Sequence, residues 1–360
     1  MAQYVDLLLQ EALFRRNEIP EPVETVYCGG GTPSLLSPAL WKKLFAGLRE
    51  IFDFAADIEF TSEANPGTVT EGWLEAALDS GVNRLSLGMQ AFQPEILETL
   101  GRIHRFPEVE KSVRLARSFG IRNLSLDLMF GIPGQTASHW QETLDSAFSL
   151  QPEHLSAYGL IPEEGTPLVR DLAQGKLRLP EPEEEREMYE TVLRACAARG
   201  MKQYEISNFA LPGLACRHNI GYWTHVPYLG LGLAAASLSD IQPGPAGMTC
   251  RRHTNPEEWN AYEVMVKALA ERGLDALVRE EIGPKEARFE TMMLGLRMNA
   301  GVGDSEFLDR HGCLPQAIWD DQLNSFVRQG LLRHEGGRWQ LTRRGQDLQN
   351  SVLVDLMDFS

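Results

Sequence analysis

Two hydrophobic periodicities alternate along the first 160 residues, and this alternation constrains the fold more than any other feature of the chain. Stretches with apolar residues at helical spacing separate five short segments that alternate like β-strands. The strand segments are residues 23–28, 57–63, 84–90, 123–129 and 154–158. Because strands that alternate with helices of this length form right-handed βαβ units, the sequence predicts an α/β fold with a parallel sheet.

The rest of the chain has a different pattern, which predicts three parts. We expect a βα core at 1–165, then a helical connection and a loop region at 166–255, and a mostly helical module at 256–360. Residues 201–255 are rich in glycine, proline and aromatic residues, so we interpret them as a functional loop region without regular structure. Residues 318–356 follow a helix–strand–strand–helix order, which is typical of a winged-helix module.

Charge and hydropathy exclude some classes of partner. The chain has 50 acidic and 34 basic residues, a net charge of −16, so we expect no nucleic-acid partner. No run of 18 apolar residues is present, which predicts no membrane span. The N-terminus lacks the basic and apolar regions of a secretory signal, so we expect a cytoplasmic protein.

The five cysteines are too scattered for a common structural use. No two of them are closer than 20 residues, and no C-x-x-C pair exists. The odd number and wide spacing argue against a disulfide framework. They also argue against a zinc or iron–sulfur site built from clustered thiolates.

Each predicted strand ends in a polar or glycine-rich segment, where the ligands of parallel sheets bind. These ends are 29–34, 63–67, Gln90, Asp127 with 131–136, and 161–165. In the first, three glycines and Thr32 would let the backbone approach a ligand with exposed N–H groups. The spacing is not that of a nucleoside-triphosphate loop, because no lysine follows before Lys42. A tight strand-to-helix turn without a ligand explains the three glycines equally well.

Four polar residues at or beyond the strand ends suggest a zwitterionic ligand. Arg102 would bind a carboxylate, and the acids Glu63 and Asp127, with Gln90, would bind an amine or ribose hydroxyls. For each residue taken alone, a solvated side chain is the simpler interpretation.

The segment 216–223 combines a thiol, an imidazole and two aromatic rings within eight residues. An axial His218 or Cys216 beside Tyr222 and Trp223 is the arrangement that a haem site requires. A structural histidine is the alternative, although the predicted loop context favours function. The glycine-punctuated segment 228–237 is most simply a buried strand or turn.

At this point the motifs match a known family. The runs V-E-T-V-Y-C-G-G-G-T-P-S, S-E-A-N-P-G, G-V-N-R-L-S-L-G-M-Q, L-G-R-I-H, L-D-L-M-F-G-I-P-G-Q-T, H-L-S-A-Y, Q-Y-E-I-S-N-F-A and H-N-I-G-Y-W closely resemble the haem chaperone HemW family. That family belongs to the radical S-adenosylmethionine proteins and is related to oxygen-independent coproporphyrinogen III oxidase. The resemblance covers nearly the whole chain from Tyr4 onward.

The resemblance implies a partial (β/α)₆ barrel that binds S-adenosyl-L-methionine at its carboxyl rim. On the matching positions it implies an S-adenosylmethionine site made of Gly30, Gly31, Thr32, Glu63, Gln90, Arg102, Asp127, Gly131, Gly134 and Ile161. The H-N-x-x-Y-W motif implies a haem site made of His218, Asn219, Tyr222 and Trp223, with His218 as the candidate iron ligand and Cys216 as its alternative.

Two departures from the family pattern qualify these expectations. The family begins with a strand ending in C-x-x-x-C-x-x-C, whose thiolates hold a [4Fe–4S] cluster, whereas this sequence starts at the following helix. We expect either a start site assigned too late or a degenerate paralogue, and favour the first because the other ligand-binding residues are intact. Ala236 stands where the family has a histidine, which weakens the porphyrin side of the site.

Three functions follow from this resemblance. The leading hypothesis is a chaperone, rather than an enzyme, that binds haem and delivers it to an unidentified acceptor protein, soluble or membrane-bound. The second is an oxygen-independent coproporphyrinogen III oxidase, whose radical chemistry needs the cluster. The third is a scaffold without cluster or activity.

Overall fold

The computed structural model describes residues 1–19, 22–244 and 247–357. These residues form two compact units that are interleaved in the sequence. The first comprises Met1–Glu24, Lys43–Asp57 and Arg217–Ser360, and the second comprises Thr25–Lys42 and Ile58–Cys216. The sequential three-part division proposed above stays a prediction.

A seven-stranded sheet in the order β1-β2-β3-β4-β5-β7-β6 carries the first half of the chain. Strands β2 to β5 pair in parallel, and β6 and β7 add an antiparallel hairpin next to β5. The strands are β1 Val23–Cys28, β2 Phe54–Ala64, β3 Arg84–Gln90, β4 Asn123–Phe130, β5 His154–Gly159, β6 Lys202–Glu205 and β7 Asn208–Ala210. This arrangement confirms the predicted α/β fold with a partial barrel.

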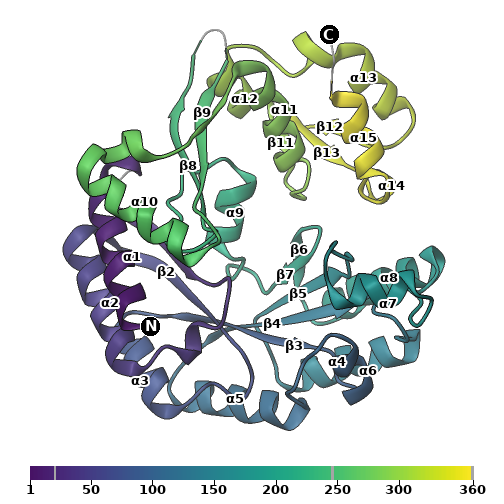
Figure 1. Cartoon of the computed structure of the whole chain (residues 1–360). Coiled ribbons are helices and arrows are strands. Elements are labelled where there is room, and N and C mark those ends of the chain that lie inside the picture. The colour runs from purple at the N-terminus through teal and green to yellow at the C-terminus, as the bar shows by residue number, and fades with distance from the viewer. Residues whose placement is uncertain (20–21, 245–246, 358–360) are drawn as a thin grey trace. The chain divides into compact units, whose positions relative to one another are not determined.

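Helices connect these strands and lie along one side of the sheet (Figure 1). Those of the βα core are α2 Pro38–Ile51, α3 Glu71–Asp79, α4 Pro94–Thr99, α5 Phe106–Ser118 and α6 Ala137–Ser149, with α7 Pro167–Ala173 and α8 Pro182–Ala198 in the connection. The Thr70 hydroxyl accepts a hydrogen bond from the Trp73 N–H and so caps α3. Helix α7 ends at Ala173 and α8 begins at Pro182, so the connection contains two separate helices.

Alternation within the strands gives the sheet two different faces. In β4, Leu124, Leu126 and Leu128 are fully buried apolar residues, and Ser125 and Asp127 alternate with them. The register places Asp127 of β4 beside Ser156 of β5, and Ser125 beside His154. One face therefore carries a buried polar row, whereas the other supplies apolar side chains to the core.

The prediction that residues 201–255 lack regular structure is wrong. They contain the β6–β7 hairpin, helix α9 Arg217–Trp223, and strands β8 Ala236–Gln242 and β9 Thr249–Thr254. These elements are short, and glycine and proline between them hide their periodicity. Strand β10, Glu280–Ile282, joins β9 and β8 in an antiparallel sheet of order β10-β9-β8.

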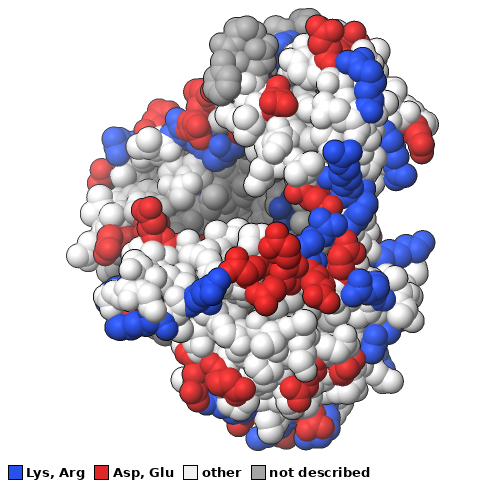
Figure 2. Space-filling model, turned by 90° about the vertical axis from the view of Figure 1, so that its right-hand side faces the viewer, with Lys and Arg blue, Asp and Glu red and all other residues white. Residues whose placement is uncertain are grey.

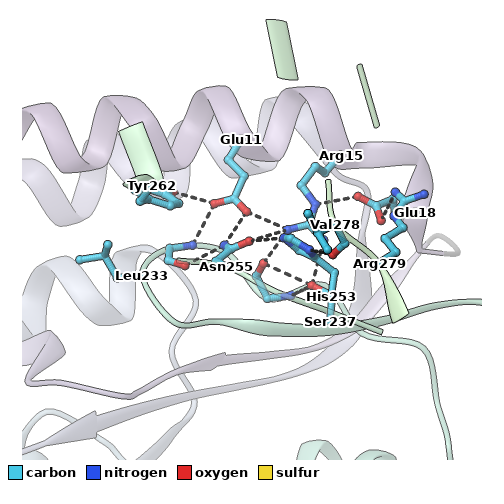
Figure 3. Close-up of polar contacts among 12 residues, drawn as sticks. Glu11, Arg15, Glu18, Leu233, Ser237, His253, Asn255, Tyr262, Val278 and Arg279 are labelled. Carbon is cyan, nitrogen blue, oxygen red and sulfur yellow. Dashed lines mark hydrogen bonds and ion pairs between the residues drawn. The ribbon is translucent and has the colours of Figure 1, made fainter. Parts of the chain in front are cut away.

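A buried network of hydrogen bonds around an ion pair joins helix α1, Ala2–Arg15, to this antiparallel sheet and to helix α10, Trp259–Arg272 (Figure 3). Glu11 and Arg15 are both fully buried, with Arg15 Nη1 2.8 Å from Glu11 Oε1. Arg15 Nη2 donates to Ser237 Oγ at 2.9 Å, and the Tyr262 hydroxyl donates to Glu11 Oε2 at 2.6 Å. The network fixes α1 against both segments because each partner supplies a compensating charge or hydrogen bond.

The C-terminal residues form the predicted winged-helix-like module. Its sheet has the order β11-β13-β12, and its core contains Phe307, Trp319 and Trp339. The elements are α11 Pro284–Gly295, β11 Val302–Gly303, α12 Asp304–His311, α13 Gln316–Arg328, β12 Leu332–Glu335, β13 Arg338–Leu341, α14 Arg343–Asp347 and α15 Gln349–Leu356. The last predicted helix is thus divided into two at Leu348, whose backbone is not helical.

No helix within the described residues is long and apolar enough to cross a membrane. Figure 2 shows basic and acidic side chains mixed on one face of the molecule, with acidic side chains gathered near its middle. This mixture favours the expectation of no nucleic-acid partner, which stays a prediction.

Candidate functional site

The glycine segment after β1 forms a loop held by Glu63 of β2. Tyr27 donates its hydroxyl to Glu63 Oε1 at 2.7 Å, and the Gly30 N–H lies 3.3 Å from Glu63 Oε2. A Cβ at Gly29 would lie 2.7 Å from the Tyr27 ring and 2.8 Å from the Glu63 carboxyl group, so a larger residue there would displace the side chains that hold the loop. The space around Gly30 and Gly31 is open, which leaves their backbone accessible to a ligand.

A second contact fixes the far end of this loop. Asn65, the residue directly after β2, donates its side-chain N–H to Thr32 Oγ1 at 2.9 Å. Glu63 and Asn65 are two residues apart, the spacing at which successive side chains of a strand share a face. We did not predict Tyr27 or Asn65 as site residues, although this period-two spacing is visible in the sequence. The structure thus places Gly30 beside Glu63 and Thr32 beside Asn65, and their role in ligand binding stays a prediction.

The two predicted carboxylates are half-buried and differ from ordinary surface acids. Burial raises the pKa of Asp127, and hydrogen bonds from Ser86, Ser156 and Ser125 oppose that rise. Ser86 Oγ lies 2.8 Å from Asp127 Oδ2. Burial also raises the pKa of Glu63, against the bond from Tyr27. Raised carboxyl pKa values in a polar row mark this face as a candidate site.

Gln90 ends β3 in a left-handed backbone conformation. Its φ is 64°, which is uncommon for a residue other than glycine, and it is 9% exposed. The β3–β4 register shifts between Gly88 and Gln90, and a side chain at Gly88 would lie 2.9 Å from Gln90 Nε2. Strain of this kind persists at functional sites when the surrounding structure enforces it.

The remaining predicted residues lie in the loops after the strands. Gly131 and Gly134 have positive φ values of 74° and 80°, which glycine adopts readily. Arg102 is half-buried in the loop between α4 and α5, and its backbone N–H donates to the Leu97 carbonyl. Ile161 is 80% exposed and the unpredicted Ile103 is 96% exposed, so both offer apolar surface to a ligand.

The described residues include no group of three His, Cys, Asp or Glu side chains placed to hold a metal ion. Burial raises the pKa of the Cys28 thiol to about 12, which disfavours the thiolate that iron requires. The residues described here therefore do not fit a [4Fe–4S] cluster.

The H-N-x-x-Y-W motif lies on a helix, so the expectation that it lies outside regular structure is wrong. Helix α9 spans Arg217–Trp223, and the four-residue spacing places His218 and Tyr222 on one face. His218 Nε2 is 2.8 Å from the Tyr222 hydroxyl, and Tyr222 packs edge-on against Tyr228 at 4.7 Å. Seven residues with a central glycine do not show a clear helical period.

The other motif residues differ in exposure. Trp223 is half-buried, and its indole Nε1 has no hydrogen-bond partner among the described residues. Asn219 is also half-buried. Cys216 is 3% exposed, and its thiol lies 3.4 Å from Glu59 Oε1, so it is less accessible to iron than His218. Ala236 is exposed at the start of β8 and pairs with Thr254.

Comparisons with known proteins identify the family of this chain. Residues 4–147 match the Radical SAM superfamily, and residues 282–348 match the HemN C-terminal domain. The haem chaperone HemW of Bacillus subtilis is 36% identical, with 97% of this chain and 90% of the relative aligned. HemW of Escherichia coli is 34% identical over 92% of this chain and 83% of the relative.

Among solved structures, the coproporphyrinogen III oxidase HemN of Escherichia coli is similar over 99% of this chain and 83% of that chain. The TM-score is 0.80 and the sequence identity is 23%. This likeness shows a shared fold, namely the radical SAM barrel with the HemN-type C-terminal module.

Proposed function

This chain belongs to the haem chaperone HemW family, and we propose that it binds haem and delivers it to an acceptor protein. The observation that carries the proposal is the pairing of His218 and Tyr222 on one face of α9. An imidazole beside an accessible aromatic surface is the chemistry that a haem site needs.

The residues present fit a haem group. His218 would supply an axial nitrogen to the iron, in exchange for its bond to the Tyr222 hydroxyl. Tyr222, which is 38% exposed, and the half-buried Trp223 would cover part of the apolar disc. Burial of that large apolar surface would supply most of the affinity, whereas the axial bond would fix orientation.

A haem titration of His218→Ala tests the proposal. We expect a shifted Soret band and an affinity reduced by about tenfold or more, because one coordinate bond is lost. His139→Ala is the matched control, since His139 is a half-buried histidine on α6. Cys216→Ala should leave the spectrum unchanged, because its thiol is buried beside Glu59.

Two results would contradict the assignment. An unchanged spectrum and affinity in His218→Ala would remove His218 as the iron ligand. A loss only in Cys216→Ala would move that role to the thiol. Absence of haem binding by the wild-type chain would support the scaffold hypothesis instead.

We further propose that the strand ends bind S-adenosylmethionine. The open backbone at Gly30 and Gly31 would hold its methionine part, and Glu63 would lie by the amino group. Gln90, Asp127 and Arg102 would reach the ribose and carboxylate, and the loops at Gly131, Gly134 and Ile161 would line the adenine. In this proposal these residues would bind S-adenosylmethionine and fix its orientation.

The oxidase hypothesis has no separate support from the fold. A likeness to HemN at 23% identity shows the fold alone, and the HemW relatives are more similar in sequence. The acceptor protein and the cytoplasmic location expected from the sequence stay predictions.

A further inference from the structure

His225, two residues after the haem motif, combines two features that folding of its turn does not require. Its backbone φ is 54°, a left-handed value that favours glycine. Its side chain is 1% exposed, yet neither ring nitrogen has a hydrogen-bond partner among the described residues. Glycine would avoid both the backbone strain and the buried polar ring, so the imidazole itself calls for another explanation.

The turn itself is an ordinary helix end. The Thr224 N–H donates to the Ile220 carbonyl at 3.0 Å, and the Val226 N–H donates to the Gly221 carbonyl at 3.0 Å. This pattern closes a helix around one left-handed residue, which is most often glycine. The backbone bonds are complete without any contribution from the His225 ring.

The ring faces a buried acid on another helix. His225 Nε2 lies 3.6 Å from Glu290 Oε2 of α11, and Glu290 is 15% exposed. Arg252 Nη2 donates to both Glu290 oxygens, at 2.8 and 2.9 Å. Burial would raise the pKa of Glu290, but the contacts with His225 and Arg252 outweigh it and hold the pKa below its usual value. Glu290 therefore presents a carboxylate to the imidazole.

Two further contacts reach the same end of α9 from the C-terminal module. Arg297 lies with its guanidinium carbon 4.5 Å from the Trp223 ring centre. Arg310 Nη2 donates to the Thr224 carbonyl at 2.8 Å. Residues 223, 224 and 225 are thus each held by a charged side chain from the segment 290–310.

We propose that His225 is a positioning residue, whose contact with Glu290 fixes helix α9 so that His218 and Tyr222 are presented together to haem. This inference rests on the proposed haem-binding function. It assigns to the C-terminal module the role of orienting a motif that it does not contain. His225 does not touch haem in this proposal, because its ring is buried.

Glycine at position 225 distinguishes a positioning role of the His225 ring from a role in the turn alone. His225→Gly keeps the left-handed turn and removes the ring, so unfolding by urea should occur at an equal or higher midpoint. We expect hydrogen exchange of residues 217–226 in the haem-free protein to quicken by about tenfold, and the haem dissociation constant to rise by about tenfold with a shifted Soret band. His225→Asn, which also tolerates this backbone, should match His225→Gly.

Glu290→Gln should reproduce these effects from the other side of the contact. Glu271→Gln, at an exposed glutamate on α10, is the control. If His225→Gly or Glu290→Gln showed the same hydrogen exchange rates and the same haem affinity as the wild-type chain, His225 would be only a turn residue. That result would overturn the inference. Haem binding that needs His218 but not His225 would overturn this inference alone. Loss of the His218 dependence would overturn the proposed function as well.

Discussion

Replacement of Glu11 by glutamine should strongly destabilise the chain, because this carboxylate accepts four hydrogen bonds in a dry environment. Oε1 accepts from Arg15 Nη1 at 2.8 Å and from Asn255 Nδ2 at 2.8 Å. Oε2 accepts from the Gly232 N–H at 2.9 Å and from the Tyr262 hydroxyl at 2.6 Å. In Glu11→Gln an NH₂ group replaces one carboxylate oxygen, so the two donor groups that bonded to that oxygen then face the NH₂ group, which is itself a donor.

The magnitude follows from these contacts. Two lost hydrogen bonds to a charged acceptor are each worth about 1.5–3 kcal/mol. Glu18 Oε1 stays 2.6 Å from Arg15 Nε and still compensates the cation, so we expect the lower part of the range, about 3 kcal/mol in total. With a urea slope of about 3 kcal/mol per molar, the unfolding midpoint should fall by about 1 M. Burial and the Glu11 charge raise the pKa of Tyr262, so its phenol remains a donor.

Asp6→Asn supplies the matched control on the same helix. Asp6 pairs with Lys43, but both side chains are about half exposed, so the change should be within about 1 kcal/mol. Urea unfolding followed by circular dichroism and tryptophan fluorescence compares the two variants with the wild-type chain. If Glu11→Gln lowers the midpoint no more than Asp6→Asn, the buried network does not contribute as argued.

Two further predictions concern S-adenosylmethionine binding and the pH dependence of stability. Calorimetry should show that Glu63→Gln weakens S-adenosylmethionine binding by about tenfold, which is the effect of one charge-assisted hydrogen bond. Glu71→Gln, at an exposed glutamate, should leave the affinity unchanged. If Glu63→Gln and the wild-type chain bound S-adenosylmethionine equally well, Glu63 would not have the proposed role. Burial lowers the pKa of His311 to about 4, whereas the pKa of a histidine in the unfolded chain is near 6.5. Between about pH 6.5 and about pH 4 the unfolded state therefore binds more protons than the folded state, and stability falls as the pH falls. From pH 7 to 5 this group should remove about 2 kcal/mol of stability, and His311→Gln should reduce that pH dependence in urea unfolding.

The βα core could be predicted from the sequence because its elements are long and periodic. The strand predicted at 84–90 coincides with β3 Arg84–Gln90, and the strand predicted at 154–158 ends within one residue of β5 His154–Gly159. Alternating and helical patterns of this length each specify one structure. The winged-helix-like module was predictable for the same reason, since two strands and their flanking helices follow in order.

The elements of segment 201–255 could not be predicted from hydrophobic periodicity. Strand β7 has three residues and helix α9 has seven, so neither contains enough repeats to define a period. Their stability comes from partners distant in sequence, such as Arg310 on the Thr224 carbonyl. The same holds for Arg15, whose burial depends on Ser237 and Asn255, and which the sequence presents as an ordinary helix-terminal arginine.

Strand register explains why some site residues could be predicted together and others could not. Glu63 pairs with Ser86, and Gly88 pairs with Asp127, so β2, β3 and β4 present their polar residues at neighbouring levels of one sheet. Because parallel strands share a carboxyl edge, residues that end consecutive strands must lie near one another whatever the connecting helices do. Arg102 lies in the loop between α4 and α5, where no register limits its distance from the sheet. The place of Arg102 therefore could not be predicted from the sequence, whereas the juxtaposition of Glu63 with the row containing Asp127 follows from the strands themselves.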